Sequence, residues 1–275
     1  MIRIDMSGKS VLITGGTKGI GLAAALVFGR AGARTYLTYK WGSDDFTPLY
    51  DLFKKNNAAP PLLFQADVAI PEDTDALLQD VKKHEKRIDI FISNVGVAQR
   101  ARSLRDYRKR SLYRTLDYST WPLIEYTKKI HEVFDCYPRH IVGISSDGPD
   151  HFYSGYDYVA ASKALLEFFA KYLSVHLFEE GSRVNIIRFG PVNTESFSLV
   201  FGKEFFDFLK EQGVPEEMFI TTENCGETVF ALCSGLLDAV NGQIITADKG
   251  MSFRDNMMMR YLKEKEKKKK MERNG

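Results

Sequence analysis

Residues 11–29 read VLITGGTKGIGLAAALVFG, an apolar run followed by a glycine-rich turn and an alanine-rich stretch. The apolar run is typical of a buried strand, and the alanines and leucines that follow favour a helix. Three glycines in the turn let backbone approach a pyrophosphate, which the N–H groups at the helix N-terminus can hold. The alternative is a tight turn that binds nothing. The candidate phosphate-binding residues are Gly15, Thr17, Lys18, Gly19, Ile20 and Gly21.

The rest of the chain repeats this order of strand and helix. Patterning predicts further strands at residues 35–39, 62–65, 88–93, 139–145, 183–189 and 242–247. Helices are expected at 72–85, 116–134, 156–177 and 225–236, the second interrupted or restarted near Pro122 because proline is tolerated only in a helix's first turn. Alternation of this kind indicates parallel pairing with right-handed crossovers. We therefore predict an α/β fold: a single Rossmann-type, doubly wound parallel sheet of about seven strands with helices on both faces, spanning residues 1–255.

The amino-acid composition argues against several classes of function. The chain has 275 residues, 44% of them hydrophobic, and a formal net charge of +2, which argues against bulk nucleic-acid binding. Its three cysteines have no metal-ligand spacing, so we expect reduced thiols, no metal site and a cytoplasmic setting. No apolar run approaches the roughly 18 residues of a membrane span. The charged residues 256–275 cannot bury a core, and we expect them to be disordered or to form a frayed helix.

The end of the second predicted strand suggests which dinucleotide would bind. Lys40 follows it directly, with no carboxylate at the strand end. A carboxylate there would bind the ribose 2′-hydroxyl of NAD, whereas a lysine can pair with the 2′-phosphate of NADP. Lys18 offers a second cation. The two lysines favour NADPH, the alternative being that both are solvated surface residues.

Other polar residues follow later strands, at the edge where an open parallel sheet binds its ligands. Asp67 and Val68 follow the third strand, with Asp67 placed to reach the adenine, and Asn94 and Gly96 follow the fourth. Residues 195–220, after the sixth strand, are rich in phenylalanine. Such a stripe is more often core than pocket wall, yet a segment at this place could form a substrate lid.

A basic segment, Arg100 to Arg114, carries seven cations against the single acid Asp106. One reading is a solvated face. The other is a docking surface for an acidic partner or a phosphorylated substrate handle. Nucleic acid is a poorer third, because no recognition module accompanies the segment.

The stretch from Ile144 to Lys163 carries a tyrosine and a lysine whose spacing suggests a reaction. On a helix, Tyr156 lies seven positions ahead of Lys163 and roughly 20° from it around the axis, so both can face one pocket. Tyr158 would point about 140° away, and the other position on the right face is Val159.

Together these residues resemble the short-chain dehydrogenase/reductase family over most of the chain. The resemblance rests on the 14–21 turn, Asp67-Val68, Asn94-Val95-Gly96, Ser145-Ser146 and Lys163. Ordinary members place the catalytic tyrosine four residues before the lysine, where this chain has Val159.

Three departures resemble the enoyl-acyl-carrier-protein reductase branch of that family. They are the spacing of Tyr156 and Lys163, the turn Gly190-Pro191-Val192-Asn193-Thr194, and the segment Asp117-Tyr118-Ser119-Thr120-Trp121 in place of a catalytic asparagine. The glycine turn keeps the ordinary spacing, as in the NADPH-using subgroup. Many enoyl reductases have a second tyrosine where this chain has Ser146.

The resemblance implies roles for these residues. Tyr156 would donate a hydrogen bond to the enolate oxygen, and Lys163 would bind the nicotinamide ribose, with Ser146 beside them. Gly190, Pro191, Val192 and Thr194 would contact the cofactor. The tyrosine's place has a chemical reason, because reduction of an enoyl thioester puts charge on the thioester oxygen, farther from the carbon that receives hydride. Three residues along a helix shift a side chain by about 4.5 Å, a displacement of the needed order.

The leading hypothesis is therefore NADPH-dependent reduction of an enoyl thioester, bound to an acyl carrier protein or to CoA, in fatty-acid or polyketide-type biosynthesis. The acidic carrier would dock on Arg100–Arg114, and the family's habit implies a homotetramer or homodimer. Two alternatives stay open: a carbonyl reductase acting on a secondary-metabolite ketone, and a nucleotide-binding protein with a degenerate active site.

Overall fold

The computed structural model describes residues 4–41 and 45–254, together with 258, 261, 262 and 265. In this part of the chain, seven parallel strands form one sheet in the order β3-β2-β1-β4-β5-β6-β7. They are β1 (Ser10–Ile13), β2 (Arg34–Tyr39), β3 (Leu62–Gln65), β4 (Ile90–Ser93), β5 (His140–Ser146), β6 (Arg183–Phe189) and β7 (Ile244–Ala247). The strand order reverses between β1 and β4, which is the topology of the doubly wound Rossmann fold. The predicted fold class is confirmed.

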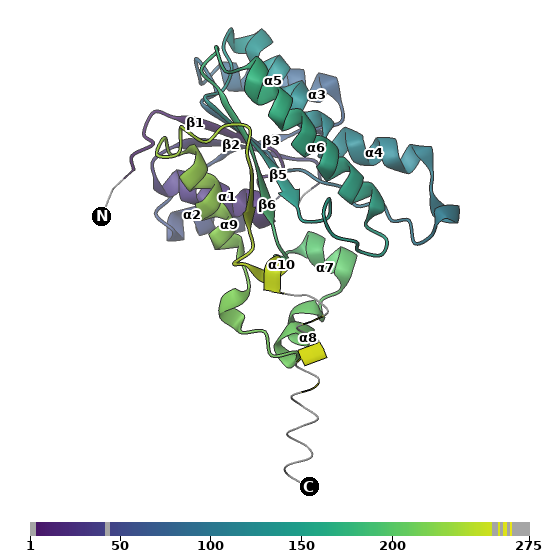
Figure 1. The fold of residues 1–275 in the computed structure, drawn as a ribbon. Coiled ribbons are helices and arrows are strands. Elements are labelled where there is room, and N and C mark those ends of the chain that lie inside the picture. The colour runs from purple at the N-terminus through teal and green to yellow at the C-terminus, as the bar shows by residue number, and fades with distance from the viewer. Residues whose placement is uncertain (1–3, 42–44, 255–257, 259–260, 263–264, 266–275) are drawn as a thin grey trace.

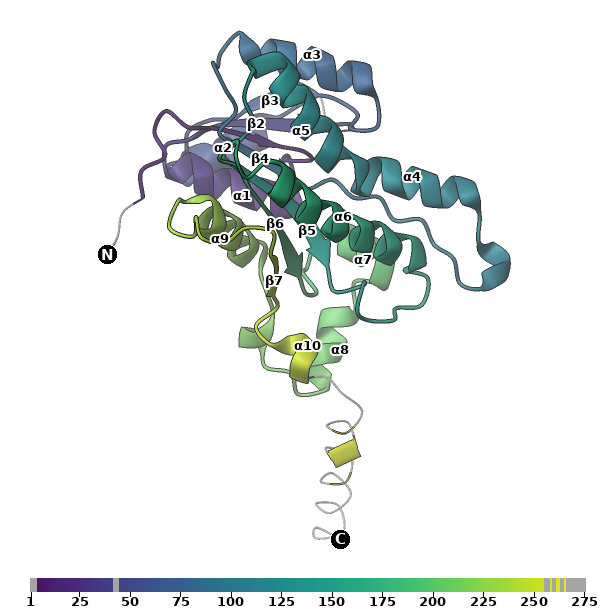
Figure 2. The ribbon, with the colours of Figure 1, turned by 45° about the horizontal axis from the view of Figure 1, so that its top comes forward.

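Helices cover both faces of the sheet (Figure 1). On one face lie α1 (Gly19–Arg30), α2 (Thr47–Lys55) and α9 (Thr222–Cys233); on the other lie α3 (Pro71–Lys82), α5 (Trp121–Phe134) and α6 (Asp157–His176). Figure 2 shows α4 (Lys109–Ser119) beside the start of α6, and α7 (Glu195–Phe201), α8 (Phe205–Glu211) and α10 (Met251–Arg254) beyond one end of the sheet. Two short 3₁₀ turns, Leu104–Asp106 and Glu216–Met218, complete the described elements. None of the helices described is long and apolar enough to cross a membrane.

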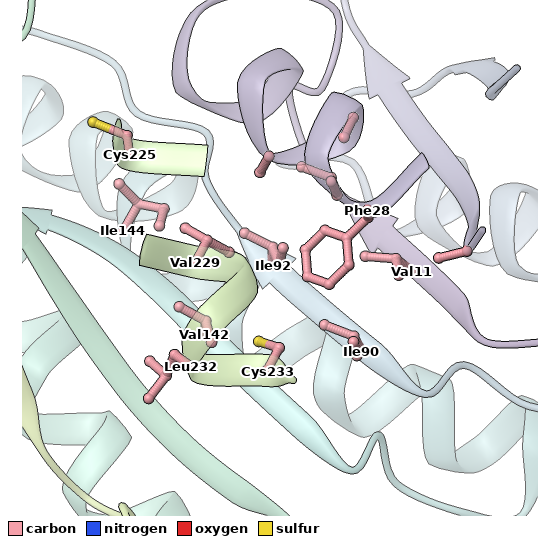
Figure 3. Packing of buried hydrophobic residues seen from close by; sticks show 14 of the residues in the cluster. Val11, Phe28, Ile90, Ile92, Val142, Ile144, Cys225, Val229, Leu232 and Cys233 are labelled. Carbon is pink, nitrogen blue, oxygen red and sulfur yellow. The ribbon is translucent and has the colours of Figure 1, made fainter. Parts of the chain in front are cut away.

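Alternate residues of each strand pack on opposite faces. Val11 and Ile13 belong to a buried cluster with α1 and α9, whereas Leu12 belongs to the cluster under α3 and α5. Figure 3 shows Phe28 of α1 among the strand residues of the first cluster. Gly226 of α9 permits the close approach of these two helices, because a Cβ there would lie 2.6 Å from the Ala23 backbone. The period-2 pattern therefore makes both faces of the sheet apolar.

Some elements differ from the sequence-based expectation. The helix expected over 116–134 is two helices, and α5 restarts at Trp121 with Pro122 in its first turn. The first of them begins at Lys109, inside the basic segment. The helix α2 was not predicted, although Leu49, Leu52 and Phe53 have helical spacing. The tail 256–275 lies almost entirely outside the described residues.

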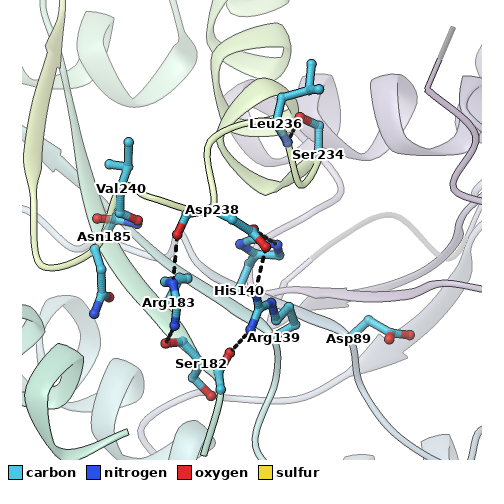
Figure 4. A network of polar contacts seen from close by, with 12 residues as sticks. Asp89, Arg139, His140, Ser182, Arg183, Asn185, Ser234, Leu236, Asp238 and Val240 are labelled. Atoms are coloured by element: carbon cyan, nitrogen blue, oxygen red, sulfur yellow. Dashed lines mark hydrogen bonds and ion pairs between the residues drawn. The ribbon is translucent and has the colours of Figure 1, made fainter. Parts of the chain in front are cut away.

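A polar cluster closes the end of the sheet opposite α7 (Figure 4). Arg139 Nη2 lies 2.5 Å from the Asp238 carboxylate, and Arg183 Nε donates to the Asp238 carbonyl at 2.8 Å. His140 Nε2 lies 3.4 Å from the same carboxylate. Burial lowers the pKa of His140, and Asp238 only partly offsets this. The three cysteines are free thiols.

Candidate active site

The glycine turn after β1 is shaped for close backbone approach. Gly15 and Gly19 have positive φ angles of 63° and 57°, and a Cβ on Gly21 would lie 2.5 Å from the Gly15 carbonyl oxygen. Asn94 at the end of β4 donates from Nδ2 to the carbonyls of Thr14 and Gly15. No side chain caps the N-terminus of α1. The turn therefore combines close backbone approach with a helix N-terminus that no side chain caps, which fits the pyrophosphate of a dinucleotide.

At the end of β2, Lys40 forms an ion pair with Asp67 and a hydrogen bond with the Tyr118 hydroxyl. Tyr118, on α4, also donates to Asp67 Oδ2 at 2.9 Å. The hydrogen bond to Asp67 raises the pKa of Lys40, and the bonds from Lys40 and Tyr118 hold the pKa of Asp67 below its usual value although burial opposes this. The two residues expected to bind the adenosine half thus contact each other through side chains, and Tyr118 joins them.

Lys163 of α6 is buried against β5 and the turn that follows β4. Its ammonium donates to the Ile144 carbonyl at 2.8 Å, and a Cβ on Gly96 would lie 3.6 Å from it. Burial lowers the pKa of Lys163 to about 8. Ser119, at the end of α4, accepts a hydrogen bond from the Val97 N–H at 3.1 Å and is buried beside the same turn.

Tyr156 and Ser146 lie together at the carboxyl end of β5. The Tyr156 hydroxyl donates to Ser146 Oγ at 3.2 Å. Burial raises the pKa of Tyr156, while the hydrogen bond with Ser146 acts in the opposite direction. Tyr156 is the N-cap residue of α6, so it stands where the loop from β5 enters the helix that carries Lys163. The structure thus brings Tyr156 and Ser146 into contact, while the Lys163 ammonium bonds to β5 at Ile144, two residues before Ser146.

The neighbouring side chains are not available for the same task. Val159 is buried and has no hydroxyl, and Tyr158 accepts a hydrogen bond from the Arg108 N–H with only 3% of its surface exposed. Tyr153 donates to the Asp147 carboxylate at 2.7 Å. Among the tyrosines of this stretch, Tyr156 is the one that bonds to Ser146.

The segment 195–220 forms an aromatic chain above Tyr156. The ring centroid of Phe201 lies 5.5 Å from that of Tyr156 and 5.8 Å from that of Tyr153. Phe197 continues the chain to Phe206, at 4.9 Å from Phe201 and 5.3 Å from Phe206. The phenylalanines thus pack mainly on one another, with one face against the candidate catalytic tyrosine.

The turn after β6 leads from the sheet into α7. Val192 is buried and forms a parallel β-bridge with Ile220. Thr194 lies beside Gly19, with its hydroxyl accepting from the Phe197 N–H at 3.1 Å as the cap of α7. Lys18 reaches Glu195 at 2.7 Å. A cavity of about 340 Å³ opens between this turn and α1.

The basic segment runs from the end of β4 to the middle of α4. Tyr107 donates to Asp157 Oδ1 at 2.6 Å, which ties the segment to the start of α6. Arg100 donates to the Leu199 carbonyl at 2.6 Å. Within the described residues, the guanidinium groups of Arg102, Arg105, Arg110 and Arg114 have no ion-pair partner. The segment therefore borders the candidate site and exposes unpaired positive charge.

Sequence reasoning gave no site role to Tyr118, Glu195 or the buried pair Glu167 and Arg188. Tyr118 stands in the segment 117–121 that suggested an enoyl reductase, so a signal was present. The other contacts join residues far apart in the chain, which no local pattern reports.

Solved structures show the same fold. A 7α-hydroxysteroid dehydrogenase complexed with NADH and 7-oxo glycochenodeoxycholic acid superposes with a TM-score of 0.79 at 21% identity, covering 90% of this chain and 96% of that one. A 3-oxoacyl-acyl-carrier-protein reductase from Brucella melitensis in complex with NAD superposes with a TM-score of 0.79 at 23% identity, covering 90% and 98%. Both structures share the Rossmann-type fold of this chain.

Sequence comparison identifies the branch. The family model described as enoyl-(acyl carrier protein) reductase matches residues 15–252, and the chain belongs to this family. It is 27% identical to the enoyl-acyl-carrier-protein reductase (NADH) FabI of Aquifex aeolicus, over 89% of this chain and 92% of that protein. It is also 27% identical to the 1-cyclohexenylcarbonyl-CoA reductase of Streptomyces collinus, over 88% and 86%. The protein is accordingly an NAD(P)H-dependent oxidoreductase.

Proposed function

We propose that the protein reduces the carbon–carbon double bond of an enoyl thioester, with Tyr156 as the hydrogen-bond donor to the substrate. The observation that carries this is the placement of the Tyr156 hydroxyl on Ser146, at the start of the helix that holds Lys163, with the hydroxyl-free Val159 buried behind it. A ketone reductase of this family would need a hydroxyl at position 159.

The chain's own residues then divide the work. When bound, the nicotinamide supplies a hydride to the β-carbon. Negative charge develops on the thioester oxygen, where a preplaced donor stabilises it best, and Tyr156 would supply that donor. Lys163, with one N–H on Ile144, keeps two for the ribose hydroxyls and adds positive potential while it is charged. The enolate then takes a proton from water at its α-carbon, which gives the saturated thioester.

The test is NADPH consumption with a crotonyl or longer enoyl thioester. Tyr156→Phe should lower kcat by about 10²–10³, while Tyr50→Phe, at an exposed tyrosine of α2, should leave it unchanged. Supplying β-ketoacyl thioesters and free ketones separates the proposal from a carbonyl reductase. Wild-type turnover of ketones alone, or equal turnover by both variants, contradicts it.

We further propose that NADPH is the preferred cofactor. Support comes from the described end of β2, where Lys40 rather than a carboxylate follows Tyr39. A 2′-phosphate would take over the Lys40 ammonium from Asp67. Lys40→Met should therefore lower kcat/KM for NADPH by at least tenfold and leave that for NADH nearly unchanged; equal losses with both cofactors would count against the proposal.

The acyl group, we propose, arrives on an acidic carrier protein that docks on the basic segment, as part of fatty-acid or polyketide-type chain building. The four arginines without an ion-pair partner among the described residues support this. Their exposed positive charge can attract and orient a partner protein whose surface is negatively charged. Arg110→Glu with Arg114→Glu should raise KM for a carrier-bound substrate far more than for a small thioester. Lys54→Glu with Lys55→Glu, on the opposite face, is the matched control. Equal changes for both substrates indicate a solvated face.

We also propose that the protein forms a homo-oligomer in which α6 lies at the subunit interface. The outer face of this helix exposes Phe168, Tyr172 and Val175, between 50% and 75% of each side chain. Large apolar side chains clustered in this way are typical of interfaces. Light scattering on the purified protein should show a dimer or tetramer, and Phe168→Glu should dissociate it.

A further inference from the structure

Four polar side chains form a connected network beneath the candidate active site. Arg188 of β6 donates from Nε and Nη2 to the two carboxylate oxygens of Glu167 on α6, both at 2.6 Å. Ser145 of β5 donates to Glu167 Oε1 at 2.7 Å. The remaining guanidinium nitrogen, Nη1, reaches the carboxylate of Asp150.

The centre of this network is buried. The Arg188 side chain is 14% exposed and that of Glu167 is 6% exposed, whereas Asp150 at the outer end is 60% exposed. Removing two charges from water is costly, and apolar residues of similar volume often give equal stability. A two-pronged pair of this kind fixes the orientation of both side chains. We therefore read the buried pair of Arg188 and Glu167 as a means of fixing side-chain orientation rather than of stabilising the fold.

Three of the four members are near a candidate catalytic residue in the chain. Ser145 immediately precedes Ser146, and Glu167 lies one helical turn after Lys163. Asp150 stands in the 147–156 loop, which ends at Tyr156. The loop has contacts within itself, such as Tyr153 to Asp147, and its tyrosine rings also pack on Phe201. Arg188 links this loop to β6 through Asp150 and links β6 to α6 through Glu167.

We propose that Arg188 and Glu167 are positioning residues that hold the 147–156 loop, and with it the Tyr156 hydroxyl, in register with Ser146 and Lys163. The role of Tyr156 in this statement rests on the proposed function. Neither Arg188 nor Glu167 is assigned contact with the substrate; each acts through the loop.

The first test uses Asp150→Ala, which cuts the outer link at an exposed position and leaves the buried pair intact. Hydrogen exchange of the peptide 147–156 should become about tenfold faster, and kcat should fall about tenfold with KM for the cofactor unchanged. The matched control is Asp238→Asn, which removes the ion pair with Arg139 at the opposite end of the sheet. It should alter neither exchange in this peptide nor kcat.

A second test asks whether the effect passes through Tyr156. In a Tyr156→Phe background, Asp150→Ala should lower kcat by less than twofold, because the hydroxyl to be positioned is already absent. The double variant Glu167→Leu, Arg188→Met removes the buried charges as a pair, and should keep its melting temperature while losing activity as Asp150→Ala does.

The outcomes separate the two ideas. Unchanged exchange and kcat in Asp150→Ala, or an equal loss of kcat in both tyrosine backgrounds, overturns the positioning role. Should the wild type reduce no enoyl thioester, the proposed function fails, and the exchange comparison alone decides whether Arg188 holds the loop.

Discussion

Lys163 is buried at a cost to folding that a single substitution should reveal. Its pKa is lowered from 10.5 to about 8 because burial penalises the ammonium. Each pH unit between these values corresponds to about 1.4 kcal/mol, so below pH 8 the charge destabilises the folded protein by about 3 kcal/mol relative to pH above 10.5. Lys163→Met keeps the apolar stem and removes the charge, but loses the hydrogen bond to the Ile144 carbonyl, worth about 1 kcal/mol.

The variant should therefore be more stable than the wild type by about 2 kcal/mol at pH 7 and slightly less stable near pH 10.5. The reversal arises because the wild-type lysine gains stability as pH rises from 8 toward 10.5, where the unfolded chain also loses its proton. Urea unfolding of both proteins without cofactor at pH 7 and pH 10 measures it. Buried tyrosines and cysteines also titrate at high pH, but they are common to both proteins and cancel in the difference.

A variant that is less stable at pH 7, or a difference that does not change with pH, would refute the reasoning, since it would mean that the Lys163 ammonium is not desolvated. The same variant should lose turnover. If Lys163→Met is both more stable and less active than the wild type, the Lys163 charge serves function and lowers the stability of the fold.

Other predictions test the site and the fold. Gly148→Ala should lower kcat about tenfold without changing KM for the cofactor, because the new Cβ would lie 2.7 Å from Cε1 of Tyr156; unchanged kinetics would show that the ring can move freely. Ser146→Ala should lower kcat by about tenfold or less and move the alkaline limit of the kcat profile upward, because the hydrogen bond that lowers the pKa of Tyr156 is lost. The wild-type melting temperature should fall as pH drops below about 6.5, because burial lowers the pKa of His140 and protonation then favours the unfolded chain. His140→Gln should flatten that slope between pH 7.5 and 5, and an equally steep slope in the variant would assign it to other groups.

Much of the architecture was predictable because its causes are local. Apolar runs bounded by turn residues predicted six of the seven strands to within two residues at each end. The apolar run Val11 to Ile13 predicted the seventh strand, β1, to within one residue. Proline in the first turn of α5 placed a helix start that spacing alone left open. The short helix α2 was missed because its pattern spans only two turns.

The sequence predicted which residues belong to the candidate site, but not which of them contact one another. Sequence spacing alone put Tyr156 and Lys163 on one helix face and left Ser146 without a partner. Only the tertiary structure put the Tyr156 hydroxyl on Ser146, paired Lys40 with Asp67 and Lys18 with Glu195, and set Phe201 against Tyr156.

The division has a physical reason. Strands, helices and the glycine turn follow from backbone preferences and periodicity within short windows. The sequence by itself therefore determined the Rossmann fold, and it predicts a dinucleotide site at the glycine turn. Contacts between side chains from different strands depend on how the sheet and helices pack, as with Arg188, Glu167 and Asp150, which come from three separate elements. Those contacts, and the burial that shifts the pKa of Lys163, were decided by the tertiary structure alone.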